Sequence, residues 1–426
     1  MSPNAHSIAA VHAPHMLPFS CNFCGSTESW LMADLGVQPL ANNYLRSSQD
    51  IARESSYPLT ARVCAQCRLC QVDRIVSPTE IFSHYAYFSS FSSSWVEHAR
   101  RYVEAMTKRF AIGSQSLVIE VASNDGYLLR HFVASGVPVL GIEPASNIAA
   151  YANAEGIRTV NRFLTVETAQ DLVSQGMQAD LIAANNVLAH VPDLNDFIGG
   201  LARLLKPSGV LTVEFHHLMQ LLAHGQFDTI YHEHFSYLSL EVVERMFAAH
   251  GLNVFDVEEL TTHGGSLRVY ARRADGQSRE VSANVARVRA AERAAGLAEE
   301  VTYAAFDQKV RAVRESVRTF LAHAKAEKKN VVAYGAAAKG NTLLNYCGLT
   351  TADMAYTVDK NPHKQGQLLP GSHIPIVAAE KLGETKPAYV LILPWNIAPE
   401  ITAEHAYISA WGGRFVVALP KTRIVS

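Results

Sequence analysis

The stretch VIEVASNDGYLL, which runs from Val118 to Leu129, holds the end of an apolar strand and the start of a helix. Its apolar run contains one acidic residue, Glu120, and the residues Asn124, Asp125 and Gly126 supply the turn. A strand that turns into a helix in this way presents the backbone N–H groups of the helix start to a ligand. The stretch therefore predicts a ligand-binding turn in an α/β sheet.

Short apolar segments recur after this turn. Four strand candidates are spaced to leave room for crossover helices: SLVIEVAS (116–123), VPVLGIEP (137–144), ADLIAANNVL (179–188) and GVLTVEF (209–215). This rhythm is typical of a doubly wound parallel sheet, and it predicts the α/β fold class. Two further candidates, NVFDVEEL and SLRVYARR, look like a closing pair of strands.

The loop chemistry favours S-adenosylmethionine (SAM) over a dinucleotide. A dinucleotide loop needs the pattern G-x-G-x-x-G, and this loop has only Gly126. Glu143, at the end of the next strand, can accept hydrogen bonds from both ribose hydroxyls. The alternative is an ordinary strand–helix turn with solvated acids. The residues expected at the cofactor are Glu120, Ala122, Asn124, Asp125, Gly126, Glu143, Asn185 and Asn186.

Two cysteine pairs precede this region. Cys21 and Cys24, and again Cys64 and Cys67, form CxxC units, while Cys70 and Cys347 are left over. Four thiolates are the ligand set that a tetrahedral structural zinc prefers, and zinc would hold together a segment with few large apolar side chains. Four reduced, buried cysteines are the alternative. Cys70 is expected to be a packing residue, although it could compete as a ligand.

Length and composition limit the remaining possibilities. The chain has 426 residues, 48% of them hydrophobic, and a net charge of −2, so two or three globular domains are expected. No basic face or long apolar run points to nucleic acid or a membrane, and the first residues lack the pattern of a signal peptide. A cytoplasmic protein is expected. The predicted divisions are a flexible leader (1–18), a zinc-binding domain (19–80), a central domain (81–275), a helical connector (276–328) and a C-terminal domain (329–426).

A second α/β rhythm begins after the connector. VVAYGAAAKGNTLLNY combines a strand, a small-residue loop and a helix start that carries Lys339 and Asn341. A helix start suits an anion, although the segment is not a Walker loop. The alternative is a degenerate domain without a ligand.

Proton-transfer groups crowd the segment YHEH, residues 231–234. It supplies a phenol, two imidazoles and a carboxylate, just before an apolar helical pattern. An isolated histidine is usually a structural side chain, whereas a cluster near the carboxyl edge of a sheet favours chemistry. His190, in the loop after the third strand candidate along the chain, is expected to face the same pocket.

Several long motifs resemble those of the sugar C-methyltransferases that act on nucleotide-linked deoxysugars, often called C-3'-methyltransferases. The resemblance covers nearly the whole chain. The motifs are the paired CxxC module, GVQPLANNYL, YPLTARVCAQC, YAYFSSFSSSWVEHAR, EVASNDGYLL, FDTIYHEHFSYLSL, THGGSLRVYARR, YGAAAKGNTLLNY and VDKNPHKQGQLLPGSHIPI. It implies a zinc-binding domain, a SAM-binding Rossmann-like domain and a C-terminal Rossmann-like domain, in that order.

The resemblance also implies a reaction. A base removes the proton beside the ketone of a nucleotide-linked keto-deoxysugar, expected to be dTDP-linked, and the enolate takes the methyl group of SAM at carbon 3'. The expected catalytic residues are His234 as the base, with Glu233, Tyr231 and His190 around it. The expected substrate residues are Tyr85, Phe88, His263, Lys339 and Asn341. A sugar O-methyltransferase and a non-catalytic sugar-nucleotide-binding protein are the alternatives.

The chain departs from the family pattern in two places. Cys70 stands where an aliphatic residue is usual, and His216 and His217 stand where less polar residues are expected. The histidine pair lies near the expected substrate pocket and could mark an altered sugar.

Overall fold

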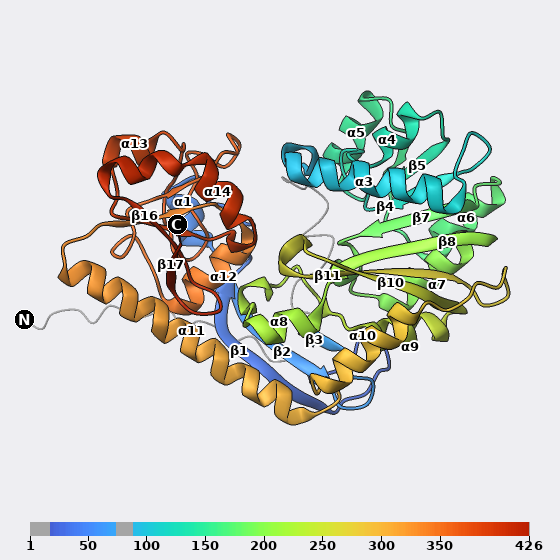
Figure 1. Cartoon of the computed structure of the whole chain (residues 1–426), viewed down its shortest axis with the longest axis horizontal. Coiled ribbons are helices and arrows are strands. Elements are labelled where there is room, and N and C mark those ends of the chain that lie inside the picture. Colours follow the sequence, from blue (N-terminus) through green and yellow to red (C-terminus); the bar gives the residue numbers. More distant parts are fainter. Residues whose placement is uncertain (1–17, 74–87, 426) are drawn as a thin grey trace, which may run out of the picture.

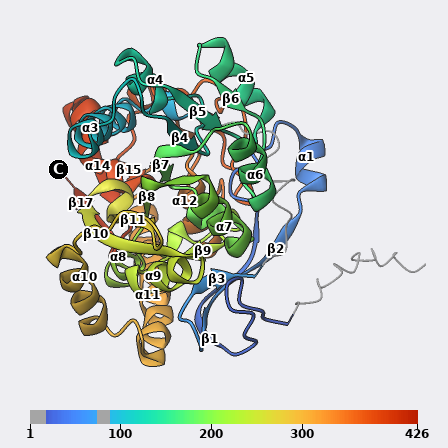
Figure 2. The ribbon, with the colours of Figure 1, turned by 90° about the vertical axis from the view of Figure 1, so that its right-hand side faces the viewer.

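The computed structural model describes residues 18–73 and 88–425, and these form two lobes joined along one side (Figure 1). The lobe on the right of Figure 1 contains a seven-stranded sheet, and the lobe on the left contains a six-stranded sheet. A four-stranded N-terminal sheet and a long helix connect them below (Figures 1 and 2). None of the helices within the described ranges is long and apolar enough to cross a membrane.

The seven-stranded sheet confirms the predicted α/β fold class. Its strand order is β10-β11-β8-β7-β4-β5-β6, with parallel pairing from β8 to β6 and antiparallel pairing of β11 with β8 and β10. The strands are β4 (Val118–Val121), β5 (Val139–Ile142), β6 (Thr159–Val160), β7 (Ala179–Asn185), β8 (Leu205–His216), β10 (Leu252–Leu260) and β11 (Ser266–Arg273). Its helices are α3 (Ser93–Phe110), α4 (Leu129–Ala134), α5 (Ser146–Ala154), α6 (Val166–Ser174), α7 (Leu194–Leu204), α8 (Leu218–His224) and α9 (Leu240–Ala249).

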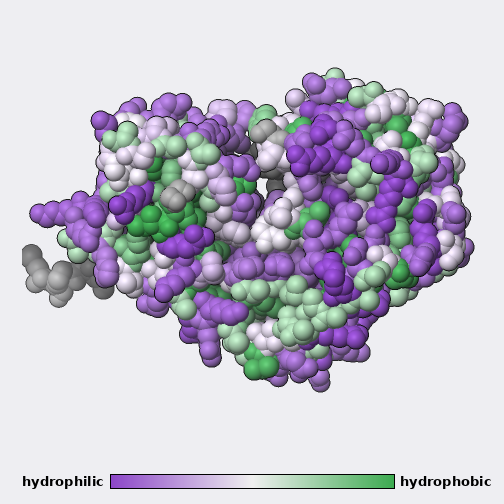
Figure 3. Space-filling view, in the orientation of Figure 1, coloured by the Kyte–Doolittle hydropathy of each residue, from purple (hydrophilic) through white to green (hydrophobic). Residues whose placement is uncertain are grey.

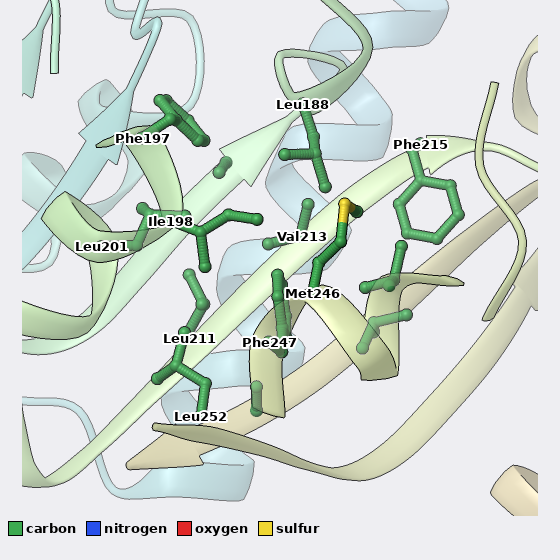
Figure 4. Packing of buried hydrophobic residues seen from close by; sticks show 14 of the residues in the cluster. Leu188, Phe197, Ile198, Leu201, Leu211, Val213, Phe215, Met246, Phe247 and Leu252 are labelled. Carbon is green, nitrogen blue, oxygen red and sulfur yellow. The ribbon is translucent and has the colours of Figure 1, made fainter. Parts of the chain in front are cut away.

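Apolar side chains fill the space between this sheet and the helices that cover it. Phe197, Ile198 and Leu201 of α7 and Met246 and Phe247 of α9 meet the inward face of β8 (Figure 4). All five are less than 5% exposed. Burial of large apolar side chains contributes about 1.5–3 kcal/mol each, so this layer holds β7 and β8, whose ends carry the site, in register.

The N-terminal sheet takes in a strand from the central part of the chain. Its order is β1-β2-β3-β9, formed by β1 (Ser29–Pro39), β2 (Ser56–Cys64), β3 (Cys70–Val72) and β9 (Ser236–Tyr237), with α1 (Ser48–Arg53) between β1 and β2. Strand β9 follows directly after the YHEH segment and pairs with β3. The cysteine module and the proton-transfer segment are therefore parts of one hydrogen-bonded unit.

The connector consists of two helices, α10 (Ala283–Ala294) and α11 (Glu300–Ala326). Helix α11 lies along β1 at the base of both lobes (Figure 1), where Tyr303 packs against Trp30. One buried cluster includes residues of β1, α8, α11 and α12 (Ala338–Cys347), so the N-terminal and C-terminal sheets share an apolar core. That shared core sets the position of the C-terminal lobe against the central one.

The C-terminal sheet has the order β14-β13-β12-β15-β16-β17 and is parallel except at β17. The strands are β12 (Val331–Tyr334), β13 (Thr357–Val358), β14 (Ile376–Val377), β15 (Tyr389–Ile392), β16 (Arg414–Val417) and β17 (Arg423–Val425). The helices are α12 (Ala338–Cys347), α13 (Lys381–Thr385) and α14 (Ala398–Glu404). Short 3-10 turns complete the chain: η1 (Ser89–Phe91), η2 (Leu188–His190), η3 (Phe227–Thr229), η4 (Thr262–Gly264), η5 (Trp395–Ile397) and η6 (Ala406–Trp411).

Candidate active site

The turn after β4 adopts left-handed backbone conformations at alternate residues. Ala122, Asn124 and Gly126 have φ angles of 55°, 48° and 77°. Only glycine enters this region without a steric cost, which is about 1–2 kcal/mol for other residues. The loop thus has the geometry of a G-x-G-x-G turn although it carries one glycine. The sequence prediction placed the turn correctly but missed the strain at Ala122.

Buried carboxyl and amide oxygens without partners surround this turn. Both carboxylate oxygens of Glu120, Oδ1 of Asp125 and Oδ1 of Asn185 have no hydrogen-bond partner among the described residues. Burial raises the pKa of Glu120 well above its usual range. Unpaired buried oxygens cost free energy unless a ligand supplies donors. A cationic cofactor with an amino group and two ribose hydroxyls would supply them, so the residues present fit SAM.

Glu143 lies at the end of β5 beside the same turn. Its carboxylate accepts the backbone N–H groups of Asn124 (3.0 Å) and Ala145 (2.8 Å), and burial raises its pKa. Each carboxylate oxygen can accept a further hydrogen bond, as two ribose hydroxyls would require. Glu143 therefore also holds the turn after β4 in its conformation.

The segment that precedes α3 is hydrogen-bonded to the turn after β4. The Asn124 side chain accepts the N–H of Ser89 (2.8 Å), and the Asp125 side chain accepts the N–H of Ser90 (3.1 Å). Phe88 packs edge-on against Tyr151 of α5. Tyr85, the other aromatic residue expected at the substrate, lies outside the described residues.

The predicted proton-transfer groups His190, Tyr231 and His234 lie together. The rings of His190 and His234 are 4.6 Å apart, and those of Tyr231 and His234 are 4.0 Å apart. The YHEH segment is a tight turn, in which the N–H of His234 donates to the carbonyl of Tyr231 (2.9 Å). This turn places the phenol and the imidazole on the same side.

Backbone carbonyls fix the tautomer of both imidazoles. Nδ1–H of His190 donates to the carbonyl of Glu233 (2.7 Å), and Nδ1–H of His234 donates to the carbonyl of Thr229 (2.9 Å). A carbonyl can only accept, so each neutral ring carries its proton on Nδ1 and a lone pair on Nε2. The Tyr231 hydroxyl donates to Nε2 of His234 (2.7 Å).

Burial keeps these imidazoles neutral. It lowers the pKa of His190 to about 4, and burial together with the nearby His190 lowers the pKa of His234 well below 6.5. Both rings therefore present an unprotonated Nε2 near neutral pH, as a general base requires.

Glu233 and His232 point toward the N-terminal module. The carboxylate of Glu233 accepts the backbone N–H (3.3 Å) and the side-chain amide (3.2 Å) of Asn42, and its other oxygen has no partner among the described residues. The imidazole of His232 donates to the carbonyl of Pro58 (3.1 Å). Glu233 thus contributes its carbonyl, rather than its carboxylate, to the His190 imidazole.

The remaining predicted substrate residues come from two loops. His263, in a left-handed conformation, accepts the side-chain amide of Asn186 at Nε2 (3.0 Å). Lys339 lies over the Trp395 ring at 4.8 Å and donates to Asn396 (2.8 Å). Asn341 is only 1% exposed, and its amide donates to the carbonyl of Ala41, so it joins α12 to the N-terminal module. Figure 3 shows the surface hollowed between the two lobes that carry these loops.

Two further residues at this place were not predicted. Asp228, in η3, accepts the indole N–H of Trp395 across the lobe boundary (2.7 Å). Burial raises the pKa of Asp228 to about 7. The only local signal was an acidic residue in the apolar context of FDTI, because its partner lies 167 residues away.

The four predicted zinc ligands form one cluster. Their sulfur atoms all lie within 4.8 Å of one another, with Cys21 and Cys67 at 3.4 Å and Cys24 and Cys64 at 3.5 Å. Tetrahedral zinc at about 2.3 Å from each sulfur separates the sulfurs by about 3.8 Å, so the set fits the ion. Cys70 is fully buried and lies 3.1 Å from the sulfur of Met32, outside the cluster.

Comparison with known proteins supports the assignment of a zinc-binding domain and of a methyltransferase domain. Three family models match: a putative zinc binding domain over residues 21–82, a methyltransferase domain over 95–257 and a C-methyltransferase C-terminal domain over 261–420. The C-methyltransferase NovU of Streptomyces niveus is 38% identical over 407 residues, which are 95% of this chain and 96% of that protein.

More distant relatives match only the central part. The ubiquinone biosynthesis O-methyltransferase of Rhodopseudomonas palustris (strain HaA2) is 27% identical over 163 residues, 32% of this chain and 63% of that protein. The crystal structure of magnesium protoporphyrin IX methyltransferase (ChlM) from Synechocystis PCC 6803 with bound SAH has a TM-score of 0.34 and 16% identity, and the match covers 42% of this chain and 83% of that one.

The predicted cofactors are confirmed by these matches together with the geometry. The enzyme is a SAM-dependent methyltransferase, and its four-cysteine cluster is a structural zinc site. The extent of the match to NovU and the C-terminal family model show that the chain belongs to the C-methyltransferase family whose motifs it resembles.

Proposed function

We propose that this enzyme transfers a methyl group to a carbon beside the ketone of a nucleotide-linked keto-deoxysugar, at carbon 3', through an enolate. The observation that carries the proposal is the pair of imidazoles, 4.6 Å apart, whose Nδ1 protons are committed to backbone carbonyls. Methylation of carbon needs a base beside the acceptor. SAM supplies an electrophilic methyl group when it is bound.

His234 serves as the base through Nε2. Its Nδ1–H bond to the carbonyl of Thr229 orients the ring and stabilises the imidazolium that forms. The Tyr231 hydroxyl, which donates to Nε2 when no substrate is present, transfers its hydrogen bond to the ketone oxygen and stabilises the enolate. In its neutral form His190 presents a lone pair on Nε2, so it holds an enolate oxygen only after gaining a proton.

The nucleotide diphosphate lies toward the C-terminal lobe in this proposal. Lys339, at the start of α12, is half-buried in the part of the cleft near His216 and His263. Its ammonium would attract a phosphate, and the first turn of α12 adds the favourable end of the helix dipole. A dTDP-linked sugar is the expected substrate.

Two measurements separate this function from its alternatives. The enzyme is incubated with methyl-labelled SAM and a panel of dTDP-linked 4-keto-6-deoxyhexoses, and the label is located by NMR. Label on carbon 3' is expected, whereas label on oxygen would show a sugar O-methyltransferase.

Exchange of the α-proton is then followed in D₂O. Wild type is expected to exchange it, and His234→Gln to lose exchange and turnover while it still binds the sugar nucleotide. Binding with no turnover by wild type would indicate a non-catalytic protein.

A further inference from the structure

His216 ends β8 at the carboxyl edge of the central sheet, and the mechanism above does not use it. Alternate residues of a strand share one face, so His216 lies on the same side as Glu214. That side also carries His98 and Thr262, both bound to Glu214. The ring of His216 is partly exposed at the end of the strand and lies close enough to Lys339 of the C-terminal lobe to feel its charge.

A chain of hydrogen bonds determines the tautomer of this imidazole. The carbonyl of Gly264 can only accept, so the amide Nε2 of Gln226 must face it (2.9 Å). The amide oxygen of Gln226 then faces His216 and accepts from the ring Nε2–H (2.7 Å). The neutral ring consequently carries its lone pair on Nδ1, the opposite arrangement to His190 and His234.

The lone pair is available to a ligand. Nδ1 of His216 has no hydrogen-bond partner among the described residues, and it is not one of the enclosed polar atoms that lack a partner. The Gln226 side chain that fixes this tautomer is held in place by packing, since Gln226 is only 2% exposed. A Cβ at Gly264, whose φ is 89°, would lie 2.8 Å from the Gln226 amide nitrogen and 2.4 Å from the Trp395 ring.

The surrounding charges determine which kind of group can donate a hydrogen bond to this nitrogen. Burial and the ammonium of Lys339 lower the pKa of His216 to about 3, so the ring is a neutral acceptor. A lone pair repels an enolate or phosphate oxygen, and the nearby ammonium disfavours a charged amino group. A neutral hydroxyl is the group that satisfies both conditions.

We infer that His216 is a specificity-determining residue whose Nδ1 accepts a hydrogen bond from a hydroxyl of the sugar ring. The inference rests on the proposed function for the class of substrate. It implies that the enzyme prefers a keto-sugar with a hydroxyl at one ring position over the same sugar with hydrogen or an amino group there.

The test uses the full-length zinc-loaded enzyme and dTDP-linked 4-keto-6-deoxyhexoses that differ only at carbon 2 or carbon 3, where they carry hydroxyl, hydrogen or amino groups. Wild type is compared with His216→Phe, which removes the acceptor, and with His216→Asn, whose amide oxygen can stand where Nδ1 stood. His224→Phe, at an exposed histidine of α8, is the matched control.

One hydrogen bond to a neutral acceptor is worth about a tenfold change in kcat/KM or Kd. H216F is expected to lose about tenfold on one hydroxylated sugar and nothing on its deoxy counterpart, H216N to retain most of the preference, and H224F to match wild type. An equal loss on every sugar, or no loss, overturns the inference. If H216F does not fold, as judged by circular dichroism, Gln226→Met is tested in its place. This variant removes the acceptor that fixes the His216 tautomer, so the preference for the hydroxylated sugar should fall about threefold. An unchanged preference overturns the inference.

Calorimetric binding keeps this inference separate from the proposed function. Should wild type methylate none of the sugars on carbon, the proposed function fails. The difference in Kd between hydroxyl and deoxy sugars, in wild type and in H216F, still decides whether His216 accepts the hydroxyl.

Discussion

Replacement of Glu214 by glutamine tests the buried hydrogen-bond and ion-pair network near the end of β8. Glu214 is fully buried on β8 and accepts hydrogen bonds from Arg268 (2.8 Å), His98 (3.0 Å) and Thr262 (2.9 Å). Burial alone would raise its pKa, but the hydrogen bond from His98 and the charge of Arg268 outweigh burial and lower the pKa to about 2.

The expected loss of stability can be calculated from this pKa shift. A fall from the usual 4.5 to about 2 corresponds to about 3 kcal/mol of stabilisation near pH 7. Loss of one partner of a buried ion pair costs about 3–5 kcal/mol, which agrees. Glu214→Gln should therefore lower the free energy of unfolding by about 3 kcal/mol at pH 7.

The pH dependence has a definite sign. Because the folded-state pKa is depressed, the stabilisation is complete above pH 4.5 and disappears as the pH falls toward 2. The difference between wild type and E214Q should shrink to about 1 kcal/mol at pH 3. Urea denaturation followed by tryptophan fluorescence measures this difference. Glu104→Gln on α3 is the control: its ion pair with Arg100 is exposed, so the free energy of unfolding should change by no more than about 0.5 kcal/mol.

A second variant checks that the cost comes from the uncompensated guanidinium. Arg268→Met in the E214Q background removes the unpaired charge, so the double variant should be more stable than E214Q alone. A cost of E214Q below about 1 kcal/mol at pH 7 with an unchanged m value would contradict the role of the buried ion pair, as would a double variant less stable than E214Q.

Three other outcomes are expected. Cys64→Ser should release zinc and unfold the N-terminal sheet, whereas Cys70→Ser should keep one zinc per chain; metal content measured by mass spectrometry decides, and equal zinc loss in both would contradict the assignment. Ala122→Gly should stabilise the protein by about 0.5–1 kcal/mol, because it relieves the left-handed strain, and a lower thermal midpoint would argue against that conformation. The acid limb of kcat/KM should lie below pH 6.5, because burial holds His234 neutral to well below its usual pKa; a limb above 6.5 in the wild-type profile would exclude this imidazole as the base.

Local pattern was sufficient to predict several parts of the molecule. The alternation of apolar strands and helices predicted the doubly wound sheet, because each strand buries both faces and reads as an apolar run. The CxxC pairs predicted the zinc ligands, since four thiolates at this spacing have few other uses. The density of proton-transfer groups in residues 231–234 pointed to the segment that places Tyr231 and His234 beside His190.

Other features have no local signature. Asn341 was expected at the substrate, yet its amide is bound to the carbonyl of Ala41, 300 residues away. The Glu233 carboxylate turns to Asn42, and Asp228 meets Trp395 of the other lobe. Each of these hydrogen bonds forms between residues far apart in the sequence, where packing of the lobes leaves buried polar atoms that need partners. A local sequence pattern does not indicate such partners.

The fold class, the zinc ligands and the turn after β4 could be predicted from the amino-acid sequence, because periodicity, thiol spacing and turn chemistry act over short stretches of chain. Which nitrogen of His190, His234 and His216 carries the proton depends on the folded structure. Those protons are assigned by carbonyls and amides that folding brings to His190, His234 and His216 from other segments, and a carbonyl can only accept.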